Sequence, residues 1–169
     1  MAKSLRSTLG VSLEEWLHLF PVSHQREYKY GSYILRENTT ADSCLLILKG
    51  KVEITKKVRG ARNLRVAVIK PGDFFGEMGM LSGLKRTASA RAMTEVKVLV
   101  MTRQDFYNLI EKDQVLGAKL ALLFARELAV RCHQVLQLLA KSNSDSDTKR
   151  KKQVNFSSVL NSVYELLAV

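Results

Sequence analysis

The chain has 169 residues, of which 46% are hydrophobic and 25% are charged, as is usual for a soluble globular protein. A chain of this length buries roughly 70% of its unfolded surface, so its core needs no disulfide or metal. No apolar run reaches the ~18 residues of a membrane span, and "MAKSLRSTLG" lacks the apolar segment of a secretory signal. Cys44 and Cys132 form no CxxC pair, which favours free thiols in a reducing cytoplasm.

The net charge of +11 is high for this length. Such a charge keeps a protein soluble, and it also favours a polyanionic partner such as nucleic acid, an acidic protein or a membrane surface. The basic residues are spread along the chain, with one dense run, "KRKK", at 149–152. No nucleic-acid recognition motif accompanies them, so direct DNA binding is not the favoured interpretation.

The first predicted element is a short helix that begins at Ser12. Ser12 and Glu15 have the spacing of a capping box, and Pro21 ends the helix. The pattern then changes to short β-branched runs separated by glycines: "YKYGSYIL", "CLLILKGKVEI", "LRVAVIKPG" and "EVKVLVM". In the third run the alternation selects Leu64, Val66 and Val68 as the apolar side. These runs predict half-buried strands of a sandwich or small barrel, with an exposed hairpin tip at "KKVRGARN".

Helical spacing returns after Met101. Thr102 and Asp105 are placed to cap "RQDFYNLIEK", and a longer helix with a broad leucine-rich face is predicted over 114–141. Residues 142–153 have the composition of a polar, basic linker, and 154–169 have the spacing of an amphipathic helix. The predicted organisation is therefore one domain over 12–141, a linker over 142–153 and a C-terminal helix over 154–169.

The segment "FGEMGMLSGLKRTASARA" at 75–92 carries the chemistry. Gly76 and Gly79 let an anion approach the main chain, and "EMGML" predicts a helical turn whose free N–H groups face it. Arg86 offers a planar fork that matches phosphate oxygens, whereas Glu77 is suited to accept a hydrogen bond from a sugar hydroxyl. The spacing predicts a sugar-phosphate pocket. The alternative from the residues alone is an ordinary Glu–Arg surface pair beside a turn.

The longer segment "GDFFGEMGMLSGLKRTASARA" resembles the phosphate-binding cassette of the cyclic nucleotide-binding domain family, which reads F-G-E, a short apolar helix, then R-[ST]-A-[ST]. The flanking "DSCLLILKGKVEI" and "YKYGSYILREN" are similar to the strands of that family, and the resemblance covers about residues 12–140. It implies a mainly β, α+β fold. The expected fold is an eight-stranded antiparallel β-barrel (a double-stranded β-helix or jelly roll) flanked by N-terminal and C-terminal helices. Ser32 and Asn38 depart from the family pattern at two turns.

The resemblance assigns roles by position. Glu77 is expected to accept from the ribose 2′-hydroxyl and Arg86 to pair with the cyclic phosphate, while backbone N–H groups complete the anion cradle. The residues expected to bind ribose and phosphate are Phe75, Gly76, Glu77, Met78, Gly79, Arg86, Thr87 and Ala88. The Thr87 hydroxyl is the candidate for base selectivity: it can hold a syn guanine, which favours cGMP, or contact phosphate alone, which leaves cAMP open. The expected ligand is thus cAMP or cGMP.

In this family a helix after the barrel covers the base and moves with the ligand. The candidate here is the helix 114–141, with Leu81, Phe124 and Arg126 as lid or relay residues. Its wide apolar face predicts either packing on the barrel or a homodimer through this helix.

The expected output is regulation and not catalysis. No serine elbow, P-loop or paired carboxylates occur, and no nucleophile accompanies Glu77 and Arg86. His18, His24 and His133 are not at metal-ligand spacing, so neither a metal nor a cofactor is expected. The residues after 141 are too few for a helix-turn-helix domain. The sequence therefore favours a cytoplasmic cyclic nucleotide sensor acting through an unknown protein effector. The alternative is a basic adaptor for nucleic acid or protein that keeps the barrel without a ligand.

Overall fold

The computed structural model describes residues 17–18, 24–57 and 63–146. The chain divides into two compact units, residues 1–128 and residues 129–169. Residues 17–18 are helical, but most of the predicted N-terminal helix lies outside the described residues. The same holds for the hairpin tip at 58–62 and for the predicted C-terminal helix at 154–169.

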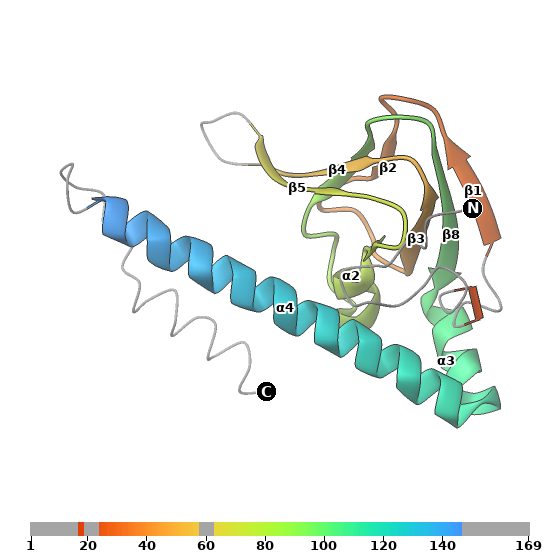
Figure 1. The fold of residues 1–169 in the computed structure, drawn as a ribbon. Helices are drawn as coiled ribbons and strands as arrows, with labels where there is room; N and C mark the ends of the chain where they lie inside the picture. The colour runs from red at the N-terminus through yellow and green to blue at the C-terminus, as the bar shows by residue number, and fades with distance from the viewer. Residues whose placement is uncertain (1–16, 19–23, 58–62, 147–169) are drawn as a thin grey trace, which may run out of the picture. The chain divides into compact units, whose positions relative to one another are not determined.

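Within the described ranges, eight strands form two antiparallel sheets of four strands each (Figure 1). The first sheet has the order β1-β8-β3-β6 and the second the order β2-β7-β4-β5. The first contains β1 (His24–Tyr28), β3 (Ser43–Lys49), β6 (Phe74–Phe75) and β8 (Val96–Thr102). The second contains β2 (Tyr33–Leu35), β4 (Val52–Lys56), β5 (Leu64–Ile69) and β7 (Ser89–Ala92). The chain passes repeatedly between the two sheets, as in a double-sheet jelly roll.

The predicted closed barrel is wrong, because no strand pairing joins the two sheets within the described part of the chain. The edge strands explain why. β6 pairs with β3 through Phe74 and Phe75 alone, and the pairing of β2 with β7 shifts register between Tyr33 and Leu35. A strand this short cannot extend its ladder to another sheet, and a register shift bends the strand that carries it. The mainly β class, with antiparallel sheets and helices, is confirmed.

The central part of β3 in the first sheet is buried on both faces. Leu45 and Ile47 of β3 face the second sheet in one hydrophobic cluster, together with Val52 and Ala90. The residues alternating with them, Cys44 and Leu46, belong to a second cluster that the helices cover. Because neither face meets water, "CLLIL" is a continuous apolar run and does not alternate with polar residues.

The face predicted for β5 is wrong. Leu64, Val66 and Val68 are 57%, 56% and 44% exposed, whereas Ile69 packs against the cluster between the sheets. β5 is an edge strand paired only with β4, and the register of that pair shifts beside Ile54. Both faces of β5 carry apolar residues. The alternation of apolar residues therefore predicts a strand correctly but does not show which of its faces packs against the other sheet.

Three helices are labelled within the described ranges: α2 (Glu77–Ser82), between β6 and β7, and then α3 (Arg103–Lys112) and α4 (Gln114–Ser146), after β8. The predicted capping box at Thr102 and Asp105 is confirmed, since each accepts a hydrogen bond from the backbone N–H of the other. α4 ends five residues beyond the predicted 141, at Ser146, and so includes residues 142–146 of the predicted linker. The other linker residues lie outside the described ranges.

The second cluster ties these helices to the first sheet. Its buried members from the helices are Met80 of α2, Phe106 and Leu109 of α3, and Leu120 and Phe124 of α4. The Phe124 ring lies edge-on to Phe74 of β6, with 5.0 Å between ring centroids. α2 and α4 therefore pack in the same hydrophobic core. The sequence predicts that α2 binds the ligand and that α4 responds to it.

Candidate functional site

The cassette, defined here as residues 76–88, begins with two conformational requirements for glycine. Gly76 ends β6 and precedes α2 with a φ of 85°, and Gly83 ends α2 with a φ of 75°. Both angles lie in the left-handed region that side chains with a Cβ rarely adopt. No side chain caps the N-terminus of α2. The N-terminus of a helix attracts anions, and the sequence predicts that one binds here.

Gly79 has a different reason for being glycine. It lies inside α2, and a Cβ at this position would collide with the Cβ of Ala41 and lie 3.0 Å from the Leu84 carbonyl oxygen. The absence of a side chain lets α2 dock directly on the segment that enters β3. This close packing sets the width of the cradle between α2 and residues 41–43.

Arg86 lies at the centre of the cradle and is only 4% exposed. Its Nη1 donates to the carbonyl oxygens of Ser43 and Gly76, both at 2.7 Å, and its Nη2 donates to Ser43 Oγ at 3.0 Å. Its main chain is paired with the turn that follows β2, through Asn38 N–H to Arg86 O and Arg86 N–H to Thr39 O, each 2.9 Å. The guanidinium is thus held from both sides of the cradle.

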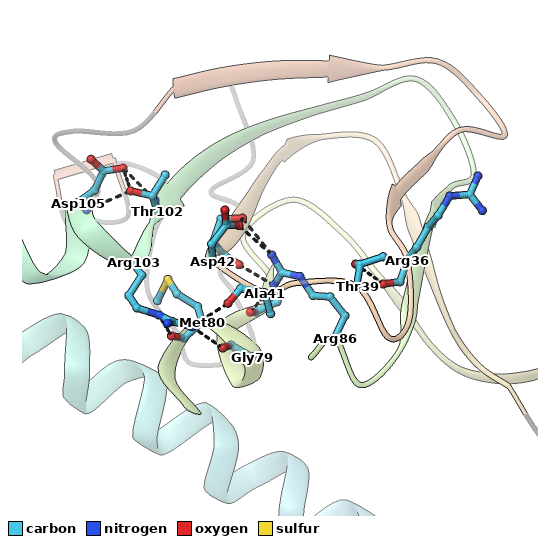
Figure 2. Close-up of polar contacts among 12 residues, drawn as sticks. Arg36, Thr39, Ala41, Asp42, Gly79, Met80, Arg86, Thr102, Arg103 and Asp105 are labelled. Carbon is cyan, nitrogen blue, oxygen red and sulfur yellow. Dashed lines mark hydrogen bonds and ion pairs between the residues drawn. The ribbon is translucent and has the colours of Figure 1, made fainter. Parts of the chain in front are cut away.

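One edge of the Arg86 guanidinium is open to a further acceptor. Its buried Nε has no hydrogen-bond partner among the described residues. Nη2, on the same edge, lies 3.9 Å from a carboxylate oxygen of Asp42, whose side chain is 77% exposed (Figure 2). Nε and Nη2 together form the fork that binds two oxygens of a phosphate, so the geometry offers an anion site here.

The electrostatics of the cradle are those of a buried cation with acidic neighbours. Burial lowers the pKa of the Arg86 guanidinium, and the negative charges of Asp42 and Glu77 oppose that shift. The guanidinium stays protonated because its ordinary pKa is far above neutrality. Holding this charge out of water is costly, and a bound anion would offset that cost.

Glu77 is the second buried charged residue of the cassette, at 1% exposure. Burial raises the pKa of the Cys44 thiol strongly, and the charge of Glu77 raises that pKa further. Cys44 is therefore an uncharged thiol of the core at neutral pH. A buried carboxylate beside a buried guanidinium is suited to bind a ligand with both hydroxyl and phosphate groups.

The far end of the cassette is held from β4. Lys56 Nζ donates to the Thr87 carbonyl oxygen at 2.6 Å and to the Glu37 carboxylate at 2.7 Å. Glu37 also accepts from the Lys57 backbone N–H at 2.9 Å. Thr87 itself is exposed, and its hydroxyl lies 4.0 Å from the Met78 sulfur. The side chain of Thr87, the candidate for base selectivity, is therefore exposed, while its carbonyl oxygen is held by Lys56.

The other predicted site residues differ in how far they are exposed. Phe75 is buried between the sheets, Met78 is 48% exposed, and Ala88 is half-buried. Of the predicted relay residues, Phe124 is fully buried, Arg126 is exposed, and Leu81 is 37% exposed. The residue of α2 that packs in the core is Met80, next to Leu81.

Sequence reasoning missed three residues that hold the cassette. Ser43 supplies two acceptors to Arg86, Lys56 holds the Thr87 carbonyl, and Arg103 binds the end of α2. All three come from segments far away in the chain, and none carries a local pattern of its own. The one feature of the sequence that could have indicated Ser43 is its position at the start of the apolar strand β3.

Within the described ranges, no cluster of three His, Cys, Asp or Glu residues has the arrangement of a metal site. No helix in the same ranges is both long enough and apolar enough to cross a membrane. Cys44 and Cys132 are both free thiols, the first buried and the second exposed, as the sequence predicts.

Comparison with known proteins identifies the family. The model of the cyclic nucleotide-binding domain matches residues 25–113. The cyclic AMP receptor protein of Thermus thermophilus is 32% identical over 119 residues, which are 70% of this chain and 55% of that protein. The cGMP-dependent protein kinase of Caenorhabditis briggsae is 36% identical over 91 residues, which are 53% of this chain and 12% of the kinase.

A solved structure agrees. The crystal structure of the Thermus thermophilus catabolite activator protein gives a TM-score of 0.64 at 30% identity, covering 78% of this chain and 61% of that chain. This chain spans about half the length of the Thermus receptor and a small part of the kinase. Residues 25–113, which the family model matches, include the whole cassette and all of both sheets except His24. The chain belongs to the cyclic nucleotide-binding domain family.

Proposed function

We propose that this protein is a cyclic nucleotide sensor that binds cAMP or cGMP in the cassette. The observation that carries the proposal is Arg86: a guanidinium 4% exposed, held by main-chain oxygens on Nη1, with its Nε unpartnered among the described residues. A buried arginine that retains an unpartnered N–H beside the start of α2 is suited to a phosphate. The exocyclic oxygens of a cyclic phosphate would accept from Nε and Nη2.

Glu77 adds the selectivity for a sugar. Its buried carboxylate is close enough to Arg86 to influence the pKa of the guanidinium. A ribose 2′-hydroxyl beside the cyclic phosphate would donate to this carboxylate, while a second phosphate in the same place would be repelled. The pair therefore supports a cyclic mononucleotide over cyclic di-GMP.

The choice of base rests on Thr87, and both bases remain in the proposal. The Thr87 hydroxyl is at the surface of the cassette, where it is able to meet either a syn guanine or the phosphate. The relatives are of both kinds, since one is named a cyclic AMP receptor and another a cGMP-dependent kinase. Replacing Thr87 by Ala is expected to weaken cGMP binding more than cAMP binding. Equal losses of affinity for cGMP and cAMP would mean that Thr87 contacts only the phosphate and does not select the base.

We also propose that α4 transmits the signal. Met80 of α2 shares one core with Leu120 and Phe124 of α4, so a shift of α2 toward a bound nucleotide changes the packing that holds the start of α4. A ligand moves such an equilibrium only by its difference in affinity for the two arrangements. The effector that would read the movement is a separate protein or a second copy of this chain.

A homodimer through α4 has support from its exposed positions. Small or apolar residues recur at intervals of three and four residues along the helix, and each of them is exposed: Val115, Ala118, Leu122, Ala125, Ala129 and Cys132. This spacing is the heptad pattern of two helices that pack side by side. Leu120 and Phe124, which are buried in the core, fall outside the series.

The test of the proposed function is a calorimetric titration with cAMP, cGMP and cyclic di-GMP. Binding of at least one cyclic mononucleotide, with no binding of cyclic di-GMP, is the expected result. Absence of heat with all three would overturn the sensor. In that case salt-dependent retention on DNA would support the alternative, a basic adaptor, which the net charge of +11 allows.

A further inference from the structure

We propose that Arg103 is a positioning residue that holds the two walls of the phosphate cradle together. This inference rests on the proposed function. Arg103 is the first residue of α3 and lies outside the cassette. Its side chain reaches back to two separate segments that form the cradle, and it makes three hydrogen bonds to their carbonyl oxygens (Figure 2).

The first wall is α2. Arg103 Nε donates to the Met80 carbonyl oxygen at 2.7 Å, and Nη2 donates to the Gly79 carbonyl oxygen at 3.1 Å. The last carbonyls of a helix lack partners within it and carry the negative end of its dipole. The last turn of α2 contains no basic residue of its own. The Gly79 carbonyl oxygen also accepts from the Gly83 N–H at 3.0 Å, so Arg103 adds a second donor there, binds the Met80 carbonyl oxygen and brings a positive charge to this end of the helix.

This external support matters because α2 is short. It has six residues, with a glycine inside it and a left-handed glycine at each end. A helix of this length does not persist by itself, since too few internal hydrogen bonds offset the cost of nucleation. The contacts that α2 makes with the rest of the domain must therefore fix where its N-terminus points.

The second wall is the segment before β3. Arg103 Nη2 also donates to the Ala41 carbonyl oxygen at 2.8 Å, and the Arg103 backbone N–H donates to the Asp42 carbonyl oxygen at 2.6 Å. Ser43, the next residue, supplies two of the acceptors of Arg86. One arginine thus joins the helix that would cradle the phosphate to the segment that orients the phosphate-binding guanidinium.

Lysine cannot replace this function fully. The three bonds use both Nε and Nη2 of a planar group and reach carbonyls on two segments at once. An ammonium is a single point of charge, so it can neutralise the end of α2 without spanning both walls. Arg103→Lys keeps the positive charge but not the planar guanidinium, whereas Arg103→Met removes both. Comparing the two variants therefore separates the effect of the charge from that of the hydrogen-bond geometry.

The experiment compares nucleotide affinity in the full chain for wild type, Arg103→Lys and Arg103→Met. Each is titrated with cAMP and cGMP at a temperature where circular dichroism shows the variant folded. The matched control is Arg91→Met, because Arg91 Nε also donates to a main-chain carbonyl, Gly31 O at 2.9 Å, but outside the cassette. We expect a loss of about tenfold or more in affinity for Arg103→Met, a smaller loss for Arg103→Lys, and none for the control.

A double-mutant cycle with Arg86→Ala distinguishes positioning from general stability. If Arg103 acts by placing the groups around Arg86, its removal costs less affinity when Arg86 is already absent. Equal losses in both backgrounds, or wild-type affinity in Arg103→Met, would overturn the role of Arg103 and leave the proposed function intact. Failure of the wild type to bind either nucleotide would overturn both.

Discussion

Arg86 is the residue on which nucleotide binding is expected to depend most. It is the buried cation of the cradle, and its Nε–Nη2 edge is the one able to receive a phosphate. Arg86→Ala should weaken binding of the cyclic nucleotide by roughly 2–5 kcal/mol, because a buried phosphate loses its counter-charge. Isothermal titration of the folded variant measures this.

The control for Arg86→Ala is the same substitution at Arg91, Arg91→Ala, which removes an exposed guanidinium outside the cradle. The Arg86 variant also leaves the carbonyls of Ser43 and Gly76 without this donor, so its thermal stability must be checked first. Near-native affinity in a folded Arg86→Ala protein would contradict the assignment of Arg86 to the phosphate.

Glu37 makes stability depend on pH at the far end of the cassette. The hydrogen bond from Lys56 lowers the pKa of the Glu37 carboxyl below its ordinary 4.5, and the N–H of Lys57 lowers it further. Because the folded state has the lower pKa, ionised Glu37 stabilises the fold above the unfolded pKa. That contribution is lost as the pH falls through the folded pKa.

Glu37→Gln is therefore expected to lower the unfolding midpoint at pH 7 and to have progressively less effect below pH ~4. The measurement is thermal unfolding of both proteins between pH ~3 and pH 7. Glu53→Gln is the matched control, because Glu53 also pairs with a basic residue, Arg65, but does not contact the cassette. A difference between wild type and Glu37→Gln that stays constant over this range would rule out the linkage.

At the scale of elements, the docking of α2 on residues 41–43 depends on the missing side chain of Gly79. Gly79→Ala puts a Cβ against the Cβ of Ala41 and should destabilise the fold by about 1–3 kcal/mol, the usual range for overpacking. Adding Ala41→Gly removes the atom that collides and should recover part of this loss. Urea unfolding of the two single variants and the double variant measures the coupling.

The contact with the Leu84 carbonyl oxygen remains in the double variant, so recovery is expected to be incomplete. Nucleotide affinity provides a second measurement, because a displaced α2 changes the cradle as well as the core. If Ala41→Gly recovers nothing, the collision with Ala41 does not cause the loss.

The same elements show how far the sequence could predict the structure. Residues 75–92 fix their own local structure, since the glycines require the turns and the spacing of Glu77 and Arg86 defines the cassette. The capping box at Thr102 is equally local. These features were found because the cause and the pattern lie in one short segment.

Features set by distant segments were not predictable in this way. Arg103 reaches α2 and Ala41 from the start of α3, across 23 and 62 residues of chain, and nothing in its neighbourhood indicates that reach. The inner face of β5 is set by its pairing with β4, including a register shift that alternation cannot reveal. Closure of the barrel likewise depends on how long the edge strands are after folding.

At the scale of the whole molecule, the exposed series along α4 predicts an assembly of two chains. Leu122 is 70% exposed, so in a monomer a charge at this position would cost little. In a dimer packed through the heptad series, the same charge would be buried against its own copy and would repel it. Leu122→Glu is therefore expected to convert a dimer to a monomer while the domain stays folded. Light scattering after size-exclusion chromatography, with the exposed Lys119→Glu as control, measures this.

Cys132 offers an independent check on the same assembly. It falls in the heptad series and is exposed, whereas Cys44 is buried and held as the neutral thiol. In a parallel two-fold dimer each Cys132 would face its own copy, because equivalent heptad positions meet across such a seam. A mild oxidant that takes two electrons and two protons from the thiols should then form one disulfide between chains. Cross-linked dimer is expected for wild type and not for Cys132→Ser or Leu122→Glu. An exclusively monomeric product from wild type at a concentration where light scattering reports a dimer would mean that the two chains meet through another surface.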